Sequence, residues 1–235
     1  MKPPRLKQGP ARKRIWSRSS KMATTWTSAF GRACGWLLDR IVHGLALTRI
    51  SPNALTVIGL AINIVAAFLF GHANAANAGR MFFYAGCVIF GAGLFDMVDG
   101  RVARRNNQVT VFGSFFDSVI DRYSDVVLFF GLLVYYGRIN KFRYVVLVAF
   151  VMVTSLMVSY TRARAEALGV ECKVGIATRP VRVVILSIGL VFARGASLGH
   201  FDLLVVAVYV LAILSTFTVF QRVIHVHGEL SRMSA

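Results

Sequence analysis

Long apolar stretches separated by short polar segments make up most of this chain. They cover residues 52–70, 81–99, 112–136, 142–160, 181–192 and 201–224. Since about 20 apolar helical residues cross the hydrocarbon core of a bilayer, the pattern predicts an all-α integral membrane protein with six transmembrane helices. Ser51 and Pro52 are residue types that begin helices, which places the start of the first span. The fifth stretch is short, and its helix could begin nearer Arg179.

The segment before the first span has a different pattern. Residues 1–21 carry eight lysines or arginines and three prolines, which predicts a disordered basic tail. No clean apolar core with a small-residue cleavage site follows, as a signal peptide would require. Within residues 22–50, apolar side chains recur at steps of three or four, which predicts an amphipathic juxtamembrane helix in the membrane interface. A six-helix domain is expected over residues 51–228, with a C-terminal tail at 229–235.

Composition and charge support a membrane protein. The chain is 56% hydrophobic, with a mean hydropathy of +0.63 and a net charge of +17, which excludes a disordered protein. Its cysteines are too few and too scattered for a disulfide framework or a zinc site: Cys34, Cys87 and Cys172. Most basic residues flank apolar stretches, which argues against nucleic acid as a partner. With six spans, 21 of the 27 lysines and arginines lie on the side of the termini, so we expect a multi-pass protein of the cell (inner) membrane with cytoplasmic termini.

Acidic residues are few and clustered. The chain has ten, and five of them are aspartates between positions 96 and 125. Asp96 and Asp99 are three residues apart at the end of the second span, so they share a helix face. Asp117 and Asp121 are four apart near the start of the third span and share a face in the same way. The short connection makes these helices antiparallel neighbours, which brings four carboxylates together at the cytoplasmic surface.

Four carboxylates in a low-dielectric site need counter-ions. The local basic residues lie mostly in the connecting loop, so divalent cations suit the site better, and oxygen ligands favour magnesium, manganese or calcium. Two such ions would clamp a diphosphate and polarise the phosphorus under attack. Gly100, Arg104 and Gly113 fit phosphate chemistry, because glycine permits close approach and arginine forks onto phosphate. A carboxylate network that only fixes packing, or an ion pathway, is the alternative interpretation.

The motif around these aspartates resembles a known family. The CDP-alcohol phosphatidyltransferases share the signature D-x2-D-G-x2-A-R-x8-G-x3-D-x3-D, and this chain matches every defined position from Asp96 to Asp121. The resemblance implies that two Mg²⁺ ions, with Mn²⁺ as a substitute, are bound by Asp96, Asp99, Asp117 and Asp121. It also implies that Asp121 is the general base, that the enzyme is a homodimer, and that CDP-diacylglycerol contacts Asn53, Thr56, Gly100, Arg104 and Thr110.

A second polar cluster bears on the acceptor. Residues 159–166 close the fourth span, residues 179–182 open the fifth, and Arg222 lies late in the sixth. These segments resemble those of the prokaryotic phosphatidylinositol phosphate synthase branch of the family. The resemblance implies transfer of a phosphatidyl group from CDP-diacylglycerol to inositol phosphate, with CMP released. It assigns the acceptor phosphate to Ser159, Arg162, Arg164, Arg182 and Arg222, while Asp125 lies outside the signature as a supporting or a structural residue.

Other functions suit parts of the same sequence. A phosphatidylglycerophosphate synthase also takes a phosphorylated acceptor, and an ether-lipid donor would use the same site. A cation transporter also places carboxylates in its spans, but near the bilayer midplane and without a phosphate-binding Gly-Arg segment. A UbiA-type prenyltransferase shares the metal–diphosphate chemistry but needs two aspartate-rich motifs, whereas this sequence has one.

Overall fold

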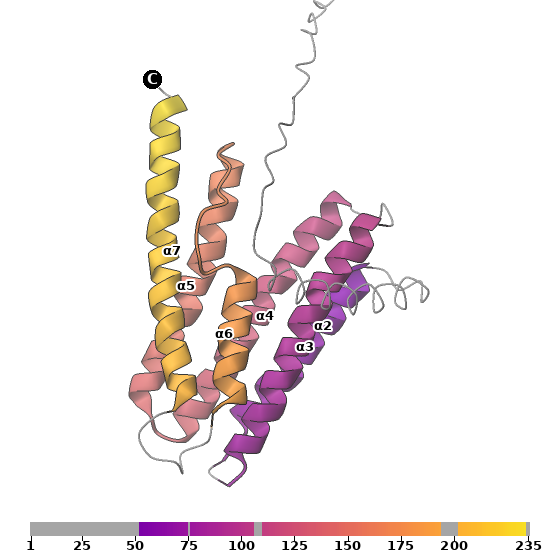
Figure 1. Ribbon diagram of the computed structural model, residues 1–235, viewed down its shortest axis with the longest axis vertical. Helices are drawn as coiled ribbons and strands as arrows, with labels where there is room; N and C mark the ends of the chain where they lie inside the picture. Colours follow the sequence, from indigo (N-terminus) through magenta and orange to yellow (C-terminus); the bar gives the residue numbers. More distant parts are fainter. Residues whose placement is uncertain (1–51, 75, 106–109, 194–201, 234–235) are drawn as a thin grey trace, which may run out of the picture. The chain divides into compact units, whose positions relative to one another are not determined.

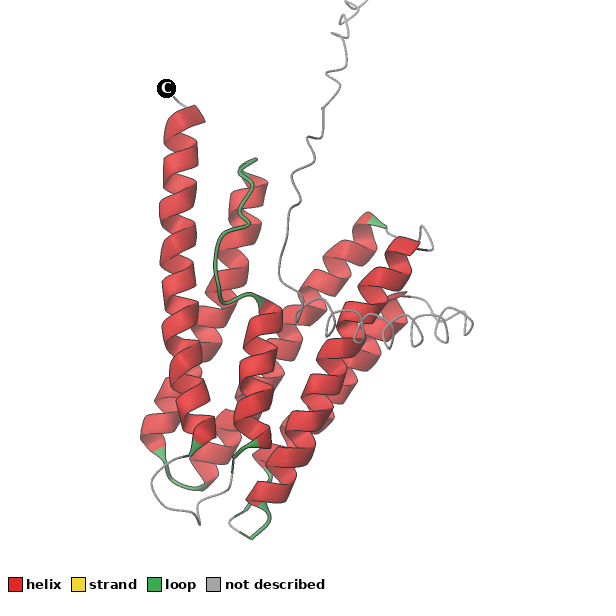
Figure 2. Ribbon diagram, in the orientation of Figure 1, coloured by secondary structure: helices red, strands yellow, loops and turns green. Residues whose placement is uncertain are grey.

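The computed structural model describes residues 52–74, 76–105, 110–193 and 202–233, with side chains for all of these except 52 and 94–105. This part of the chain forms six helices and contains no strand (Figures 1 and 2), which confirms the all-α prediction. The expected basic tail and juxtamembrane helix, residues 1–50, lie outside the described residues. The helices are α2 (Pro52–Gly71), α3 (Ala78–Arg105), α4 (Val111–Arg138), α5 (Phe142–Ala167), α6 (Arg179–Val191) and α7 (Leu203–Met233).

The described helices pack as a closed ring. Helix α2 packs against α3 and α4, α4 against α5, and α5 against α7. Helix α7 then packs against α6, and α6 against α3, which completes the circle. The order around the ring is therefore α2, α4, α5, α7, α6, α3, so α4 and α6 are not neighbours in it. Side chains of these two helices can meet only across the interior, which matters for the site.

Helix boundaries differ from the hydropathy pattern mainly at the charged ends. Helix α3 continues past Asp99 through Arg105, α5 continues past Tyr160 to Ala167, and α7 continues to Met233 within the expected C-terminal tail. Hydropathy ends where charged residues begin, but backbone hydrogen bonding continues through residues with good helix propensity such as arginine, glutamate and alanine. At the start of α6, Pro180 occupies the first turn, where its missing N–H has no helical partner to lose, so the helix begins at Arg179.

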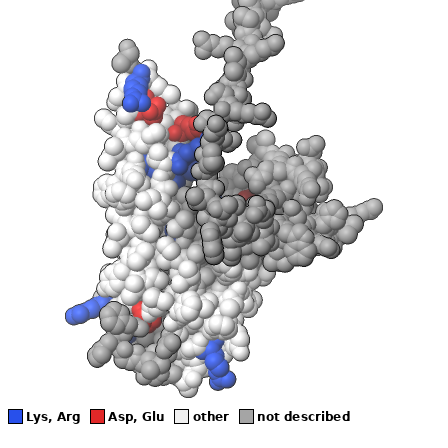
Figure 3. All heavy atoms as spheres, in the orientation of Figure 1, with Lys and Arg blue, Asp and Glu red and all other residues white. Residues whose placement is uncertain are grey.

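Three of the described helices are long and apolar enough to cross a bilayer, namely those within Asn53–Gly71, Phe142–Ala167 and Leu203–Met233. Residues 78–93 of α3 form a shorter apolar helix, and α4 carries aspartates that lower its hydropathy. Helix α6 has 13 residues, about 20 Å of rise, which is less than the roughly 30 Å hydrocarbon core. In Figure 3, charged side chains gather near the C-terminal end of α7 and at the opposite end of the same face, with uncharged surface between. Membrane insertion agrees with this pattern, whereas the count of six spans stays a prediction.

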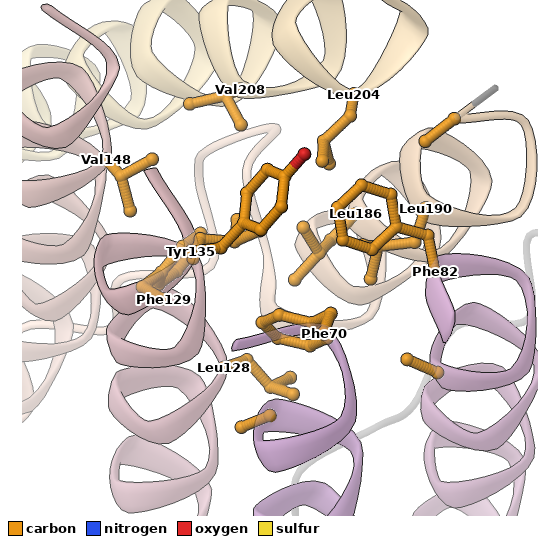
Figure 4. Close-up of a cluster of buried hydrophobic side chains, with 14 of the residues drawn as sticks. Phe70, Phe82, Leu128, Phe129, Tyr135, Val148, Leu186, Leu190, Leu204 and Val208 are labelled. Carbon is orange, nitrogen blue, oxygen red and sulfur yellow. The ribbon is translucent and has the colours of Figure 1, made fainter. Parts of the chain in front are cut away.

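One apolar core fills the ring over much of its length. It contains buried residues of all six described helices, and Figure 4 shows ten of them pointing toward one another: Phe70, Phe82, Leu128, Phe129, Tyr135, Val148, Leu186, Leu190, Leu204 and Val208. Phe82 and Tyr135 meet edge to face, with ring centroids 4.8 Å apart. A glycine allows α2 and α4 to approach closely, because a Cβ at Gly131 would lie 2.8 Å from the carbonyl oxygen of Ala67. Small residues at such crossings are typical of helices packed in membranes.

Candidate active site

A polar cavity of about 380 Å³ lies where α4 begins, α5 ends and α6 begins. Helix α4 lines it with five residues, α5 with five more, residues 178–182 with four, and α7 with one. The lining is dominated by charged and hydroxyl side chains: Ser114, Ser118, Asp121, Arg122, Asp125, Ser159, Arg162, Glu166, Thr178, Arg179, Arg182 and Arg222. The sequence segments assigned to the acceptor, which are far apart along the chain, therefore meet at one cavity.

Three aspartates follow one face of α4. Asp117, Asp121 and Asp125 are spaced four residues apart, one helical turn each. Thr56 of α2 has its hydroxyl 3.4 Å from Oδ1 of Asp117, so the first carboxylate faces α2. Asp121 and Asp125 line the cavity itself. The three aspartates thus run from the α2 side of α4 to the polar cavity.

Three of the residues assigned to the CDP moiety, Asn53, Thr56 and Thr110, lie near the start of α4. Thr110 caps this helix, since its Oγ1 accepts a 2.9 Å hydrogen bond from the backbone N–H of Gly113. A Cβ at residue 113 would lie 2.9 Å from that oxygen and 3.3 Å from Oδ1 of Asn53, so glycine allows both to come close. Asn53 and Thr56, on the first turns of α2, are therefore near the same end of α4 as Asp117.

Two arginines of α6 reach across the ring to the aspartates of α4. Arg179 places Nη1 2.8 Å from Oδ1 of Asp121 and Nε 3.9 Å from Oδ1 of Asp125. Arg182 forms an ion pair with Oδ2 of Asp125 and donates from Nη1 to the carbonyl oxygen of Ala177 at 2.9 Å. Because α4 and α6 do not pack directly, these long side chains make the link between them.

A second buried arginine of the cavity comes from α7. Arg222 donates from Nε to the carbonyl oxygen of Val174 at 2.9 Å and from Nη1 to that of Val158. Gly175 follows Val174 with φ of +117°, and a Cβ there would lie 3.2 Å from Nε of Arg222. Backbone carbonyls of α5 and of the 168–178 connection therefore hold the guanidinium at the cavity wall.

The outer part of the cavity is more exposed. Arg162 and Glu166 pair within α5 at 2.8 Å, and half of each side chain is accessible to solvent. Ser159 lies one turn earlier on the lining face. Arg164 is exposed and does not line the cavity, because a helix turns about 200° over two residues and carries it away from Arg162. The assignment of Arg164 to the acceptor phosphate stays a prediction that this geometry does not support.

Half of the proposed metal-binding set lies in a part of α3 without described side chains. Asp96, Asp99, Gly100 and Arg104 are within the helix, but their side chains fall outside the described residues. Among the described residues there is no group of three or more histidine, cysteine, aspartate or glutamate side chains arranged to hold a metal ion. The predicted metal site would therefore need Asp96 and Asp99 to join Asp117 and Asp121. Carboxylates are the hard oxygen donors that magnesium and manganese prefer, so this residue set fits the ions.

Sequence reasoning gives no role to several lining residues, and three of them are charged: Arg122, Glu166 and Arg179. Arg179 was noted at the start of a span but given no role, although it contacts Asp121. Arg122 lines the cavity and folds back along its own helix, where it donates to the hydroxyl of Ser118 at 2.7 Å. Glu166 also lines the cavity. The spacing of Arg179 three residues before Arg182, on one helix face, was the available signal.

Comparison with known proteins identifies the family. The family description "CDP-alcohol phosphatidyltransferase" matches residues 49–224, which include all six described helices up to Ile224. The chain belongs to this family. As a CDP-alcohol phosphatidyltransferase it is a membrane-bound enzyme, and the cation-transporter and UbiA-type interpretations are set aside.

Relatives within the family share most of the chain. The archaetidylinositol phosphate synthase of Methanothermobacter thermautotrophicus is 40% identical over 164 residues, covering 67% of this chain and 78% of that protein. The phosphatidylinositol phosphate synthase of Mycobacterium tuberculosis H37Rv is 32% identical over 210 residues, covering 86% of this chain and 89% of that protein.

Crystal structures of the Mycobacterium tuberculosis phosphatidylinositol phosphate synthase have a similar fold. The structure with CDP-DAG bound has a TM-score of 0.69 at 30% identity and covers 80% of this chain and 92% of that one. The structure in complex with manganese and citrate has a TM-score of 0.70 at 31% identity and covers 80% of this chain and 88% of that one. The observed six-helix arrangement is therefore that of a phosphatidyltransferase of this family.

Proposed function

We propose that the protein transfers a phosphatidyl group from CDP-diacylglycerol to inositol phosphate, forming phosphatidylinositol phosphate and CMP. The observation that carries the proposal is the arginine-lined cavity next to Asp121. Five arginines and three carboxylates line it, an excess of two positive charges, which suits a dianionic phosphate. Unphosphorylated inositol would leave that excess unmatched. The family relatives named for inositol phosphate products support the same acceptor.

The signature aspartates are the proposed divalent-metal ligands. Asp117 and Asp121 share a face of α4, and Asp96 and Asp99 belong to the adjoining part of α3. The manganese in a related structure supports metal use by this chain. When bound, two Mg²⁺ ions, or Mn²⁺ in their place, would neutralise the diphosphate of the donor and make its phosphorus more electrophilic.

The chain's own residues would carry the proton and orient the substrates. Asp121 accepts the proton of the acceptor hydroxyl, whose oxygen then forms a bond to the lipid-side phosphorus. The bond from that phosphorus to the oxygen of CMP breaks, and CMP leaves with the electron pair. Asn53, Thr56 and Thr110, near the start of α4, are proposed to contact the CDP moiety together with Gly100 and Arg104.

The acceptor phosphate is proposed to bind between the arginines. Arg182 and Arg222 are buried and fixed by other groups, so they form the inner wall, while Arg162 and Ser159 form the outer one. Arg179, which contacts Asp121, would connect the phosphate site with the base. Each charge-assisted hydrogen bond to the phosphate contributes about 1.5–3 kcal/mol.

We also infer the orientation of the enzyme in the membrane and its oligomeric state. The charge distribution along the sequence places both termini and the active site on the cytoplasmic side of the inner membrane. The family resemblance favours a homodimer. Cross-linking in native membranes tests the dimer, and the labelling of single cysteines introduced at residues 143 and 232 tests the orientation, since only the latter should be reached from the cytoplasm.

The decisive experiment measures CMP release by purified protein with CDP-diacylglycerol, and with its diether analogue, against a panel of acceptors. Inositol phosphate should be used at least tenfold better than glycerol 3-phosphate or free inositol. A chelator in excess should abolish turnover, and Mg²⁺ or Mn²⁺ should restore it. Faster turnover of glycerol 3-phosphate would replace the proposal with phosphatidylglycerophosphate synthesis, the second candidate.

A further inference from the structure

Asp125 is a buried carboxylate that the family signature does not include. It lies one helical turn after Asp121, on the same face of α4, and its side chain is 8% exposed. A buried carboxylate is destabilising unless hydrogen bonds or an opposite charge compensate it. Asp125 lines the acceptor cavity, so the groups that compensate its charge are also part of the site.

Both oxygens of this carboxylate face arginines of α6. Oδ2 pairs with Nη2 of Arg182, and Oδ1 lies 3.9 Å from Nε of Arg179. Helices α4 and α6 are separated in the ring, so the ion pairs cross the bundle interior. Asp125 is therefore the close partner of Arg182, whereas Arg179 lies closer to Asp121, at 2.8 Å.

The contacts of Arg182 define the plane of its guanidinium. Nη2 is held by Asp125 and Nη1 by the carbonyl oxygen of Ala177, on opposite sides of a planar fork. The buried Nε–H has no hydrogen-bond partner within the described part of the chain. An arginine held in this way loses little conformational entropy when an anion binds.

We propose that Asp125 is a positioning residue for the acceptor phosphate. It fixes the Arg182 guanidinium at the cavity wall, one helical turn from Asp121, and so sets where the phosphate lies relative to the base. The inference rests on the proposed function only in requiring a phosphorylated acceptor, and the identity of the polyol does not enter it. Asp125 itself acts through Arg182 and makes no contact with the phosphate.

The test compares Asp125→Asn with a matched aspartate far from the cavity. Asp202 caps α7 by accepting a 3.0 Å hydrogen bond from the Leu204 N–H, which asparagine can also accept. It precedes Arg222 by 20 residues, about 30 Å along the helix. Asp125→Asn should raise the KM for inositol phosphate about tenfold or more, with a smaller change in kcat and a KM for CDP-diacylglycerol within about twofold. Asp202→Asn should leave all three constants near wild type.

A double variant separates positioning from simple stabilisation. The variant that combines Arg182→Gln with Asp125→Asn removes both charges of the buried pair. Neither position then carries an unpaired buried charge, so the protein is less destabilised than by removing one partner alone. If Asp125 acts through Arg182, adding Asp125→Asn to Arg182→Gln should raise the acceptor KM no further. Independent, multiplying effects would overturn the proposal, and so would an Asp125→Asn enzyme whose acceptor KM is unchanged while its thermal stability falls.

The wild-type acceptor panel distinguishes this failure from failure of the proposed function. If inositol phosphate is used but its KM is the same in wild type and in Asp125→Asn, only the positioning role is wrong. If glycerol 3-phosphate is preferred, the polyol assignment is wrong, and the same KM comparison with that acceptor decides the positioning role. If an unphosphorylated acceptor is preferred, both proposals are overturned.

Discussion

The two ends of the bundle interior use the same helix faces for different chemistry. Along α4, the inward positions are Asp117, Asp121 and Asp125 at one end and Leu128, Leu132 and Tyr135 at the other. Helix α6 changes in the same way, from Arg179 and Arg182 to Leu186 and Leu190. On α7 the direction is reversed, and Leu204, Val208 and Leu211 precede Ser215, Thr218 and Arg222.

The difference separates stability from function within one ring. The apolar end places fully buried side chains from every described helix in contact, and this packing holds the ring together. The polar end buries arginines and aspartates that packing alone would not favour, and they are compensated by one another and by backbone carbonyls. A membrane protein keeps such groups where they serve ligands or catalysis. Substitutions at the two ends should therefore affect different measurements.

The largest effect is expected on turnover, from the substitution Asp121→Asn at the polar end. Asparagine preserves the shape but cannot accept the acceptor proton, so turnover should fall by about 10²–10⁴-fold. Binding of CDP-diacylglycerol in the presence of Mg²⁺ and the thermal stability of the protein should change much less. Turnover within a few-fold of wild type would show that Asp121 is not the base, and Asp202→Asn is the matched control.

At the apolar end, Leu132→Ala should act on stability alone. Leu132 is fully buried between helices, and truncation of such leucines lowers the free energy of unfolding by about 2–5 kcal/mol. Thermal unfolding in detergent should detect this loss, while the acceptor KM of the folded fraction stays at the wild-type value. Ile213→Ala, at a 67% exposed position on α7, should change stability much less. A raised acceptor KM in Leu132→Ala would contradict the separation of the two ends.

Alanine substitutions at two glycines between α5 and α6 should have different effects on the acceptor KM, and the larger of the two should be intermediate in size. Gly169 and Gly175 both have positive φ, so alanine is strained at either position. Only at residue 175 would the new Cβ collide, 2.5 Å from Cγ2 of Thr218 and 3.2 Å from Nε of Arg222. Displacing Arg222 should remove the contact with the acceptor phosphate that we propose for it. A lost contact of about 1.4 kcal/mol corresponds to a factor of ten, so the acceptor KM should rise about tenfold. Steady-state kinetics of Gly175→Ala and Gly169→Ala test this prediction. Equal acceptor KM values in the two variants would show that Arg222 does not bind the acceptor phosphate.

The smallest effect is expected at the exposed wall of the cavity. The Arg162–Glu166 pair is half accessible, and exposed pairs contribute only about 0–1 kcal/mol. Arg162→Gln should raise the acceptor KM a few-fold, with a change that shrinks at high salt. Arg164→Gln, which alters a side chain outside the cavity, should change it less. If Arg164→Gln has the larger effect, the acceptor phosphate lies elsewhere than in this cavity.

Much of this site could be predicted from sequence because its information is local. Carboxylates at three- and four-residue spacing on an apolar helix are visible without a structure, and so is the signature that includes Asp96 and Asp121. The ends of the helices were less predictable. Hydropathy stops at the charged residues of α5 and α7, while the hydrogen-bonded backbone continues to Ala167 and Met233.

The amino-acid sequence by itself determined the all-α membrane class, the family and the identity of the four signature aspartates. The tertiary structure decided which arginines meet those aspartates. Arg162 and Arg164 look equivalent along the chain, yet helix rotation brings only the first to the cavity. The link from Asp125 to Arg182 joins residues 57 positions apart on helices that are not neighbours, and it exists because the ring closes around a space that long guanidinium side chains can cross. Sequence spacing encodes contacts within a helix, whereas contacts across the ring depend on how all the helices pack.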